Sequence, residues 1–512
     1  MYTIFVYGVS RLKTMNPLNR IGSFILLMSA GGAPLAAQDH AAATGVNQVS
    51  NIRSLSTTCN SILTTRDAVR CISSVPTNTP IPKLAADHVY TLPELVDIAE
   101  SANPEGRIAW GEAKRSLERA GIDRSSYLPL LTFAAQGSNL RAIVPFPKPL
   151  APRGYVTIEE PIALAQLELH YSLLDFARRP KLEGSKALEI ASTLRLGRMH
   201  QTIANNTAQQ FYRTQQAIGQ LEAAKAILQT AETLQKNAQS QFDNGRATLP
   251  DVQNAQAGAA ESRYDLAAAE GDVKKAKLAL TEVIGVEPTA NIEIAPQDAQ
   301  PSEAFEASVD DLIQIAWKSR PDLLAKAQDL RHAKESYRVA RAAYLPTVKL
   351  DAAGGQTSAW PTADWGQLGR ANVSTWSVAA QLRWDVFNAA RQHEISSSLA
   401  EQKIAAEEQR ATQDAVTRQV WEAYVDYQTA LEQERASHSF LESAQTSYDS
   451  SLDAFNYGVR SLVDVVQAER QLAQARQEAV RARARRLQSE VSLSYATGDL
   501  LQNHALASGV HQ

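Results

Sequence analysis

Residues that could carry chemistry are few in this 512-residue chain, and they are scattered along it. The sequence holds no glycine-rich phosphate loop, no His-Glu-x-x-His metal motif and no Gly-x-Ser-x-Gly nucleophile motif. His393 and Glu394 are neighbours, but a lone pair of this kind is typical of an exposed helix surface. Two cysteines are too few for a zinc site that needs three or more thiolates. The sequence therefore predicts no enzyme, no cofactor and no metal site.

Two turns place an aspartate shortly after a glycine. Asp251 follows Gly245, and Asp464 follows Gly458. Glycine adopts the positive φ that a tight exit from a long helix often requires. A carboxylate in or near the first turn of the next helix interacts favourably with the helix dipole. The simplest interpretation of both aspartates is a helix-capping role.

The only dense basic run has four arginines: Arg481, Arg483, Arg485 and Arg486. On a helix they point in different directions among Glu478 and Glu490, which favours a solvated or salt-bridged face over a patch for RNA or lipid. The whole chain has 51 basic and 55 acidic residues and a net charge of −4. No nucleic acid partner is therefore expected.

The N-terminus has the pattern of a secretory signal. Basic residues precede the apolar stretch 21–28, and small residues follow up to Ala37, so we expect a signal peptide over 1–37. A periplasmic lead-in, 38–90, comes next. Its Cys59 and Cys71 either form a disulfide or remain two thiols. After residue 37 no apolar run reaches the length of about 18 residues that a membrane helix needs.

The rest of the chain is one unit repeated. Residues 92–138 match 309–356 at an offset of 217, as for Pro104 and Pro321. From Leu169 onward the offset is 213, as for Leu169 and Leu382. Such self-similarity indicates two copies of one structural unit. We therefore assign a first repeat to 91–285, a proline-containing linker to 286–308, a second repeat to 309–498 and a tail to 499–512.

Each repeat contains two stretches of alternating polarity, which predict strands at 129–140, 162–174, 346–357 and 374–386. One face is apolar, the other polar, and about ten residues suffice for a tilted strand to cross a bilayer. A soluble sandwich is the alternative. Aromatic residues favour the membrane because they gather as interfacial girdles. The expected girdle residues are Trp360, Trp365, Trp376, Trp384 and Tyr171. The proline-rich segment 141–161 is expected to be an exposed loop.

Four strands cannot close into a barrel, and lipid cannot satisfy the backbone groups at the edges of an open sheet. Other chains must therefore complete the sheet. Two copies would give eight strands and three would give twelve, and composition does not choose between them.

The remaining segments are long helices rich in Ala, Gln, Glu, Lys and Leu. Long helices are predicted at 178–243 and 389–456, and shorter ones at about 103–126, 247–284 and 460–497. A helix of about 66 residues would be near 100 Å long. In each repeat, two short helices end to end would flank one long helix.

These features resemble the TolC family of outer-membrane efflux proteins. The resemblance covers about residues 90–500 and rests on the duplicated layout and on the two turns 242–255 and 455–465. It implies an α+β membrane protein, with a homotrimer that forms a 12-stranded β-barrel in the outer membrane and a long periplasmic α-helical barrel. The implied function is passive export, in a tripartite efflux or type I secretion system, with a periplasmic adaptor and an inner-membrane transporter as partners.

The resemblance also implies a gate near the two turns, at the periplasmic tip. Arg460 and Asp464 match members of the family's set of polar gate contacts, whereas Gln467 replaces a second acidic residue. The tip residues singled out are Gly245, Asp251, Gly458, Arg460, Asp464 and Gln467. The rival interpretations are a periplasmic membrane-fusion adaptor and a coiled-coil structural protein of the envelope. Neither accounts for the duplication together with the amphipathic strands.

Overall fold

The computed structural model describes Leu84 and residues 88–149, 151–287, 292–296, 308–457 and 459–500. The expected signal peptide, Cys59, Cys71 and Gly458 lie outside the described residues. The described chain forms two compact units. The sheet unit comprises 125–176 and 342–388, and the helical unit comprises the described parts of 49–124, 177–341 and 389–512.

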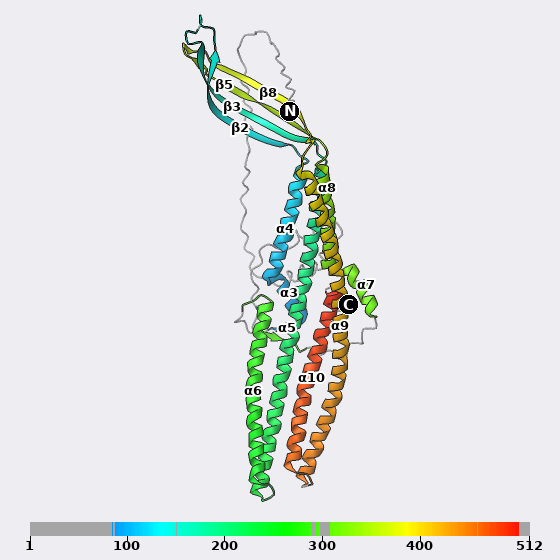
Figure 1. The fold of residues 1–512 in the computed structure, drawn as a ribbon. Coiled ribbons are helices and arrows are strands. Elements are labelled where there is room, and N and C mark those ends of the chain that lie inside the picture. Colours follow the sequence, from blue (N-terminus) through cyan, green and yellow to red (C-terminus); the bar gives the residue numbers. More distant parts are fainter. Residues whose placement is uncertain are drawn as a thin grey trace, which may run out of the picture. The chain divides into compact units, whose positions relative to one another are not determined.

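Both repeats contain the same elements in the same order, which confirms the duplicated helix-strand-strand-helix fold class (Figure 1). The first repeat has α3 (Leu92–Ala102), α4 (Pro104–Ser125), β2 (Leu130–Pro145), β3 (Tyr155–Leu174), α5 (Arg178–Asp243) and α6 (Leu249–Val283). The second has α7 (Val309–Ser319), α8 (Pro321–Ala342), β5 (Thr347–Ala359), β8 (Ala371–Arg383), α9 (Ala390–Asn456) and α10 (Leu462–Thr497). Outside the repeats, β1 (Val89–Tyr90) pairs in parallel with β4 (Glu293–Ile294).

The four long strands lie side by side in the order β2, β3, β5, β8, and every neighbouring pair is antiparallel (Figure 1). The two hairpins share one register: Leu131 faces Leu169 in the first, and the matching residues Val348 and Leu382 face each other in the second. Two short strands, β6 (Thr362–Ala363) and β7 (Gly366–Gln367), occupy the end of the second hairpin. The sheet therefore carries the duplication into its backbone pairing.

The first hairpin is longer than the sequence predicts. Residues 141–145 and 155–161 belong to β2 and β3, so the expectation of a loop over the whole of 141–161 is wrong at both ends. Pro161 lies inside β3, and its carbonyl accepts a hydrogen bond from the Trp360 N–H, 3.0 Å away. The N and C=O of a strand residue point to the same side, so the nitrogen without a proton points just past the end of β5. Only the reciprocal hydrogen bond to the Trp360 carbonyl, at the very end of the ladder, is missing.

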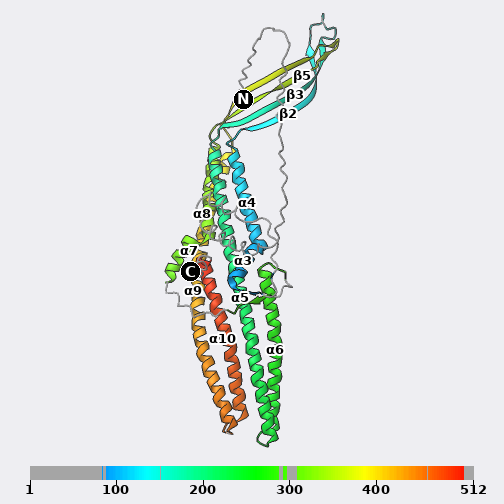
Figure 2. The ribbon, with the colours of Figure 1, turned by 180° about the vertical axis from the view of Figure 1, so that it is seen from behind.

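In the helical unit, α5 pairs with α6 and α9 with α10, as both views show (Figure 2). Their far ends share one apolar cluster that includes Leu234, Ala255, Tyr448 and Leu472. Many contacts are made by alanines, which allow helices to approach closely and favour the helical conformation. Four helices begin after a Ser or Thr with an acidic residue three positions on: Thr91 and Glu94, Thr248 and Asp251, Ser308 and Asp311, Ser461 and Asp464.

The joint between the short helices is repeated with different chemistry. In the first repeat Asn103 ends α3, and its Nδ2 donates to the Val283 carbonyl at 3.1 Å. In the second repeat the matching residue is Arg320, whose guanidinium donates to the Ala496 carbonyl at 3.2 Å. An amide and a buried guanidinium thus tie the same two helix ends together.

The last arginine of the basic run on α10 makes salt bridges, which is one of the two interpretations that the sequence allowed. Arg486 is only 2% exposed, and its guanidinium lies 2.6 Å from Glu434 of α9 and 2.9 Å from Glu490. Two part-exposed carboxylates, one from each helix, thus compensate the buried guanidinium in this triad, and removing both would leave its charge unpaired.

Glu100 of α3 and His200 of α5 are both buried without a hydrogen bond at Glu100 Oε1 or His200 Nδ1. Glu100 Oε2 and His200 Nδ1 are 3.7 Å apart, beyond hydrogen-bond range. Burial, with Asp97 nearby, raises the pKa of Glu100 to about 8. Burial also lowers the pKa of His200 to about 4. Both side chains are therefore neutral at pH 7.

Glycine is required just after α6. Gly285 has φ +73°, and a Cβ there would lie 3.2 Å from the backbone C and O of Ala102. We expect Gly285→Ala to lower the free energy of unfolding by about 2 kcal/mol, because the side chain meets rigid backbone in a strained conformation. Gly271→Ala in α6 is the control, since open space surrounds that position and alanine favours the helix. Thermal unfolding in detergent checks this, and an unchanged midpoint for Gly285→Ala would contradict it.

The Glu100 carboxyl predicts a pH-dependent stability. Its pKa is about 8 in the folded protein against 4.5 for the free group, so the folded state keeps a proton that the unfolded state loses, and stability falls as the pH rises between these values. Between pH 6 and pH 8 we expect the free energy of unfolding of the parent protein to fall by about 2 kcal/mol on account of Glu100. This fall should be absent in Glu100→Gln. Thermal midpoints at the two pH values measure it. The exposed Glu118→Gln is the control, and a parallel pH response of Glu100→Gln and the parent would refute the assignment.

Candidate functional site

One face of the sheet is apolar although nothing in the described chain covers it. Phe133, Leu167, Gly354 and Trp376 form one continuous row across the four strands. Phe133 is 67% exposed and Trp376 is 74% exposed. Neighbouring rows add further residues to this apolar face: Leu131, Leu169, Tyr171, Val348, Leu350, Ala352, Val378, Ala380 and Leu382. A large exposed apolar patch of this kind marks contact with lipid or with another protein.

The opposite face is formed by the rows that alternate with these, and it carries polar side chains. His170 Nδ1 lies 2.8 Å from Asp351 Oδ1 on the neighbouring strand, and His170 Nε2 lies 3.4 Å from Glu168. Gln166 donates to Glu168 at 2.6 Å. These polar side chains are partly exposed and paired with one another, so this polar face is suited to line water.

The outer edges of the sheet are open. Neither β2 nor β8 has a second neighbour among the described strands. The two edges are 16 and 13 residues long, which leaves two rows of backbone donors and acceptors without a partner in the sheet. Long open edges invite pairing with another chain.

The predicted girdle residues fall into two groups. Trp376 and Tyr171 lie on the apolar face, and Trp384 follows β8 with its indole N–H donating to the Tyr344 carbonyl at 3.1 Å. Trp376 and Trp384 are eight positions apart along the chain, about 26 Å of strand. At the usual barrel tilt this is about 20 Å across a membrane, close to the apolar band of about 25 Å in such barrels.

The other two tryptophans lie at the end of the second hairpin. Trp360 stacks under the Arg370 guanidinium at 5.3 Å, and Trp365 packs edge-on against Phe146 at 6.4 Å. The Trp365 contact joins the ends of the two hairpins, whereas the Trp360 contact lies within the second hairpin. Only Trp376, Trp384 and Tyr171 therefore lie at or next to the apolar rows.

The turns between the long helices have the same backbone pattern. Gly245 adopts φ +72°, and the Arg246 N–H donates to the Gln241 carbonyl at 2.7 Å. In the second repeat the matching Val459 N–H donates to the Ala454 carbonyl at 2.8 Å. Both are the closing hydrogen bonds of a glycine-type helix end.

The two aspartates are used as caps. Asp251 accepts hydrogen bonds from the Thr248 hydroxyl at 2.6 Å and from its N–H at 2.9 Å, and these bonds lower the pKa of Asp251. Asp464 accepts from the Ser461 hydroxyl at 2.9 Å and from its N–H at 3.2 Å. Each pair is a capping box, which stabilises a helix start by about 1 kcal/mol.

The turn residues singled out for a gate are not brought together within one chain. The Arg460 guanidinium donates to Ser451 of α9 at 3.2 Å, while Asp464 is engaged with Ser461. Gln467 is exposed on α10.

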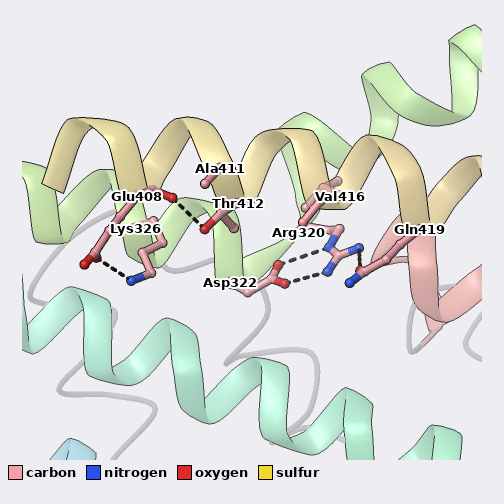
Figure 3. A pocket seen from close by; sticks show the side chains of 9 residues that line it. Arg320, Asp322, Lys326, Glu408, Ala411, Thr412, Val416 and Gln419 are labelled. Carbon is pink, nitrogen blue, oxygen red and sulfur yellow. Dashed lines mark hydrogen bonds and ion pairs between the residues drawn. The ribbon is translucent and has the colours of Figure 1, made fainter. Parts of the chain in front are cut away.

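A groove of about 340 Å³ between α8 and α9 was not signalled by the sequence (Figure 3). Its charged walls are paired: Arg320 binds Asp322 through bonds of 2.5 and 3.1 Å, and Lys326 donates to Glu408 at 2.8 Å. Residues 82 positions apart make the second pair, so no local pattern could reveal it. With its charges matched, the groove has no free group for an anionic or cationic ligand.

Among the described residues, no three His, Cys, Asp or Glu side chains gather in a way that could hold a metal ion. No helix in the described ranges has an apolar stretch long enough to cross a bilayer.

A sheet with one apolar and one polar face, joined in the chain to pairs of long helices, is the fold of outer-membrane channels. The Campylobacter jejuni CmeC outer membrane channel superimposes with a TM-score of 0.67 at 18% identity, over 81% of this chain and 88% of that one. Residues 95–286 and 312–499 match the family described as outer membrane efflux protein. The chain belongs to this family.

Two curated relatives show how far the likeness extends. The toluene efflux pump outer membrane protein TtgF of Pseudomonas putida is 26% identical over 395 residues, 76% of this chain and 78% of the relative. The cation efflux system protein CusC of Escherichia coli K12 is 25% identical over 306 residues, 59% of this chain and 65% of the relative. The match thus spans just under two thirds of the length of CusC.

Proposed function

We propose that the chain is the outer-membrane channel-tunnel of a tripartite efflux or type I secretion system. Three copies form a homotrimer, in which the sheet units make a 12-stranded barrel in the outer membrane and the helical units make a tunnel in the periplasm. The channel conducts substrates passively. A periplasmic adaptor and an inner-membrane transporter deliver them, and the protein itself catalyses no reaction.

The observation that carries this proposal is the two-faced sheet with two open edges. In hydrocarbon, each unsatisfied backbone group costs several kcal/mol, so an apolar sheet can enter lipid only when its edges are paired. The apolar rows through Phe133 and Trp376 require lipid, and the polar rows through Glu168 and His170 require water. A closed barrel of several copies meets both requirements, with lipid outside and water inside.

The long helix pairs support the periplasmic part of the proposal. The 66 residues of α5 correspond to about 100 Å of helix. Helices of this length, packed through alanines, are suited to a wall that bridges the space between two membranes. A periplasmic adaptor or a coiled-coil envelope protein would also contain long helices, but neither would need the exposed apolar face of the sheet.

In this proposal the transporter, and not the channel, selects the cargo. On the polar face His170 is already paired with Asp351, and in the groove of Figure 3 Lys326 is paired with Glu408, so these groups offer little to select a solute. A conduit of this kind passes what its transporter loads. The adaptor and transporter therefore determine whether drugs, metal ions or proteins leave the cell.

We propose the tip turns as the place where the tunnel is narrowed, with Arg460 and Asp464 as the polar gate residues. Asp464 uses one oxygen, Oδ2, for both bonds of its capping box, which leaves the other oxygen available to a neighbouring copy. We assign Gly245, Asp251 and Gln467 to the same tip, together with Gly458, which lies outside the described residues.

The channel proposal predicts a detergent-dependent trimer. Purified protein should need detergent, migrate as a trimer without heating and as a monomer after heating, and give discrete conductance steps in planar bilayers. The reason is that the apolar sheet faces and open edges are satisfied only in the assembled barrel. A water-soluble monomer without surfactant would refute the channel function.

The gate predicts a charge effect that is separable from capping. Asp464→Asn keeps an oxygen for the Ser461 cap and removes the charge, so together with Arg460→Ala it should raise single-channel conductance several-fold. The matched control is Thr248→Ala, which weakens the cap of the other turn and leaves every charge in place. Equal conductance in the parent and the Asp464→Asn, Arg460→Ala variant would reject the gate.

A further inference from the structure

Backbone pairing follows the sequence duplication closely, so a contact in one repeat predicts a contact at the equivalent positions of the other. Adding the offsets 217 and 213 to Leu131 and Leu169 of the first hairpin gives Val348 and Leu382, which pair in the second hairpin. In the helical unit, Asn103 donates a hydrogen bond to Val283. Adding the same offsets gives Arg320 and Ala496, which are also joined by a hydrogen bond. Equivalent positions in the two repeats therefore make equivalent contacts.

One strand interface has no counterpart within the chain. β3 pairs with β5, for example Leu169 with Ala352. The equivalents of these two strands are β8 and β2, which are the two open edges of the sheet. The missing counterpart is therefore a contact between β8 of one copy and β2 of the next.

We propose that a second copy of this chain seats its β2 against β8 in the register copied from β3 and β5. Leu169 with Ala352 becomes Leu382 with the partner's Ala135, and Tyr171 with Leu350 becomes Trp384 with the partner's Phe133. This proposal deepens the proposed channel function and rests on it, since it specifies how the barrel wall is closed.

The copied register keeps the two faces of the sheet consistent across the junction. Leu382 and Trp384 meet apolar partners on the apolar face. On the polar face, Glu168 with Ala353 becomes Gln381 with the partner's Gln136, two amides that can exchange hydrogen bonds. A register shifted by one residue would place apolar against polar residues, and it is excluded on that ground. A register shifted by two residues keeps apolar residues on the apolar face and polar residues on the polar face, so it is the alternative register that has to be tested.

The copied register applies to the four rows from Gln381 to Trp384. Farther along the strand pair, β5 has Gly355, where a Cβ would overlap the Ala165 carbonyl oxygen. The equivalent residue on β2 is Ser138, whose Cβ cannot approach its neighbour so closely. The two strands must separate more at that level than β3 and β5 do.

The helical unit points to the same partner independently. Ala191 of α5 and Ala325 of α8 share a buried cluster and are at most 1% exposed. Their equivalents are Ile404 of α9, 58% exposed, and Ile108 of α4, 64% exposed. Two isoleucines are thus exposed at positions where the other repeat has two buried alanines. The α4 helix of a second copy, laid on α9 as α8 lies on α5, brings Ile108 against Ile404.

Further exposed residues on α9 follow the same rule. Trp421 is 47% exposed and Val425 is 50% exposed, while the equivalent Ala208 and Tyr212 of α5 are buried in the protein core. Ala208 and Tyr212 are covered in part by α10, through Leu487 and Val491. Two arginines on α5 show what covers the Ala191 face in the first repeat: Arg195 pairs with Asp329, and Arg198 lies 3.8 Å from Asp322, both from the neighbouring α8 segment. The equivalents of these arginines, Glu408 and Ala411, line the open groove of Figure 3. That groove is therefore part of the contact with the second copy.

Paired cysteines test the register. In a full-length chain carrying Cys59→Ser and Cys71→Ser, Leu382→Cys with Ala135→Cys should form disulfides between copies and give covalent trimers on a heated, non-reducing gel. Leu382→Cys with Phe133→Cys, which represents the shift of two residues, should remain mostly monomeric, at least about five-fold below the first pair. Gln381→Cys with Gln136→Cys repeats the test one row away if the first pair assembles poorly.

A second pair tests the helical contact. Ile108→Cys with Ile404→Cys should also cross-link between copies, because both Cβ atoms would then be within disulfide reach. The control is Ile108→Cys with Ala406→Cys, since two residues turn the α9 side chain about 200° around the helix. Equal cross-linking of Ile404 and Ala406 variants would overturn the helical part of the inference.

The outcomes separate this inference from the channel proposal. A detergent-stable trimer that cross-links through the Phe133 pair and not through the Ala135 pair would overturn the register and leave the channel intact. A detergent-stable trimer in which no edge pair cross-links would likewise overturn the copied register and leave the channel intact. A monomer in detergent, by heat-dependent migration, would overturn both.

Discussion

Backbone hydrogen bonding at the two edges of the sheet is the constraint on which the rest of the molecule depends. A sheet of four strands with an apolar face cannot rest in lipid with β2 and β8 unpaired, and it cannot rest in water with Phe133 and Trp376 exposed. Both problems have the same solution, which is closure by further copies. The family to which the chain belongs is consistent with that solution.

The helical unit is governed by a different requirement, that of keeping very long helices in register. Alanine-rich contacts set close spacing, and the capping boxes at Thr248 and Ser461 fix where the returning helices start. The buried Arg486 triad and the joints at Asn103 and Arg320 then hold the pairs at fixed heights. Polar residues specify the alignment, while small apolar residues provide the packing.

The sequence predicted the fold well because its main signals are periodic or repeated. Alternation along 162–174 and the two offsets required no knowledge of tertiary structure. It was wrong about residues 141–161, since a proline-rich segment was assumed to be a loop. Pro161 is accommodated because its missing N–H points beyond the end of β5, a fact that depends on strand order. The Lys326 to Glu408 pair and the neutral Glu100 likewise depend on helices that meet only in three dimensions.

The ends of the two hairpins shape what lies outside the cell in the proposed orientation. β2 and β3 have 16 and 20 residues, whereas β5 and β8 have 13 each, and the short strands β6 and β7 continue the second hairpin alongside β3 as far as Ile158. Each subunit would therefore expose two ribbon ends in contact through Phe146 and Trp365, the first of which carries the Arg141 to Glu159 ion pair. An antibody or a bacteriophage that recognises intact bacteria would meet these ribbon ends first, so immune and viral selection would act on residues that have no part in conduction.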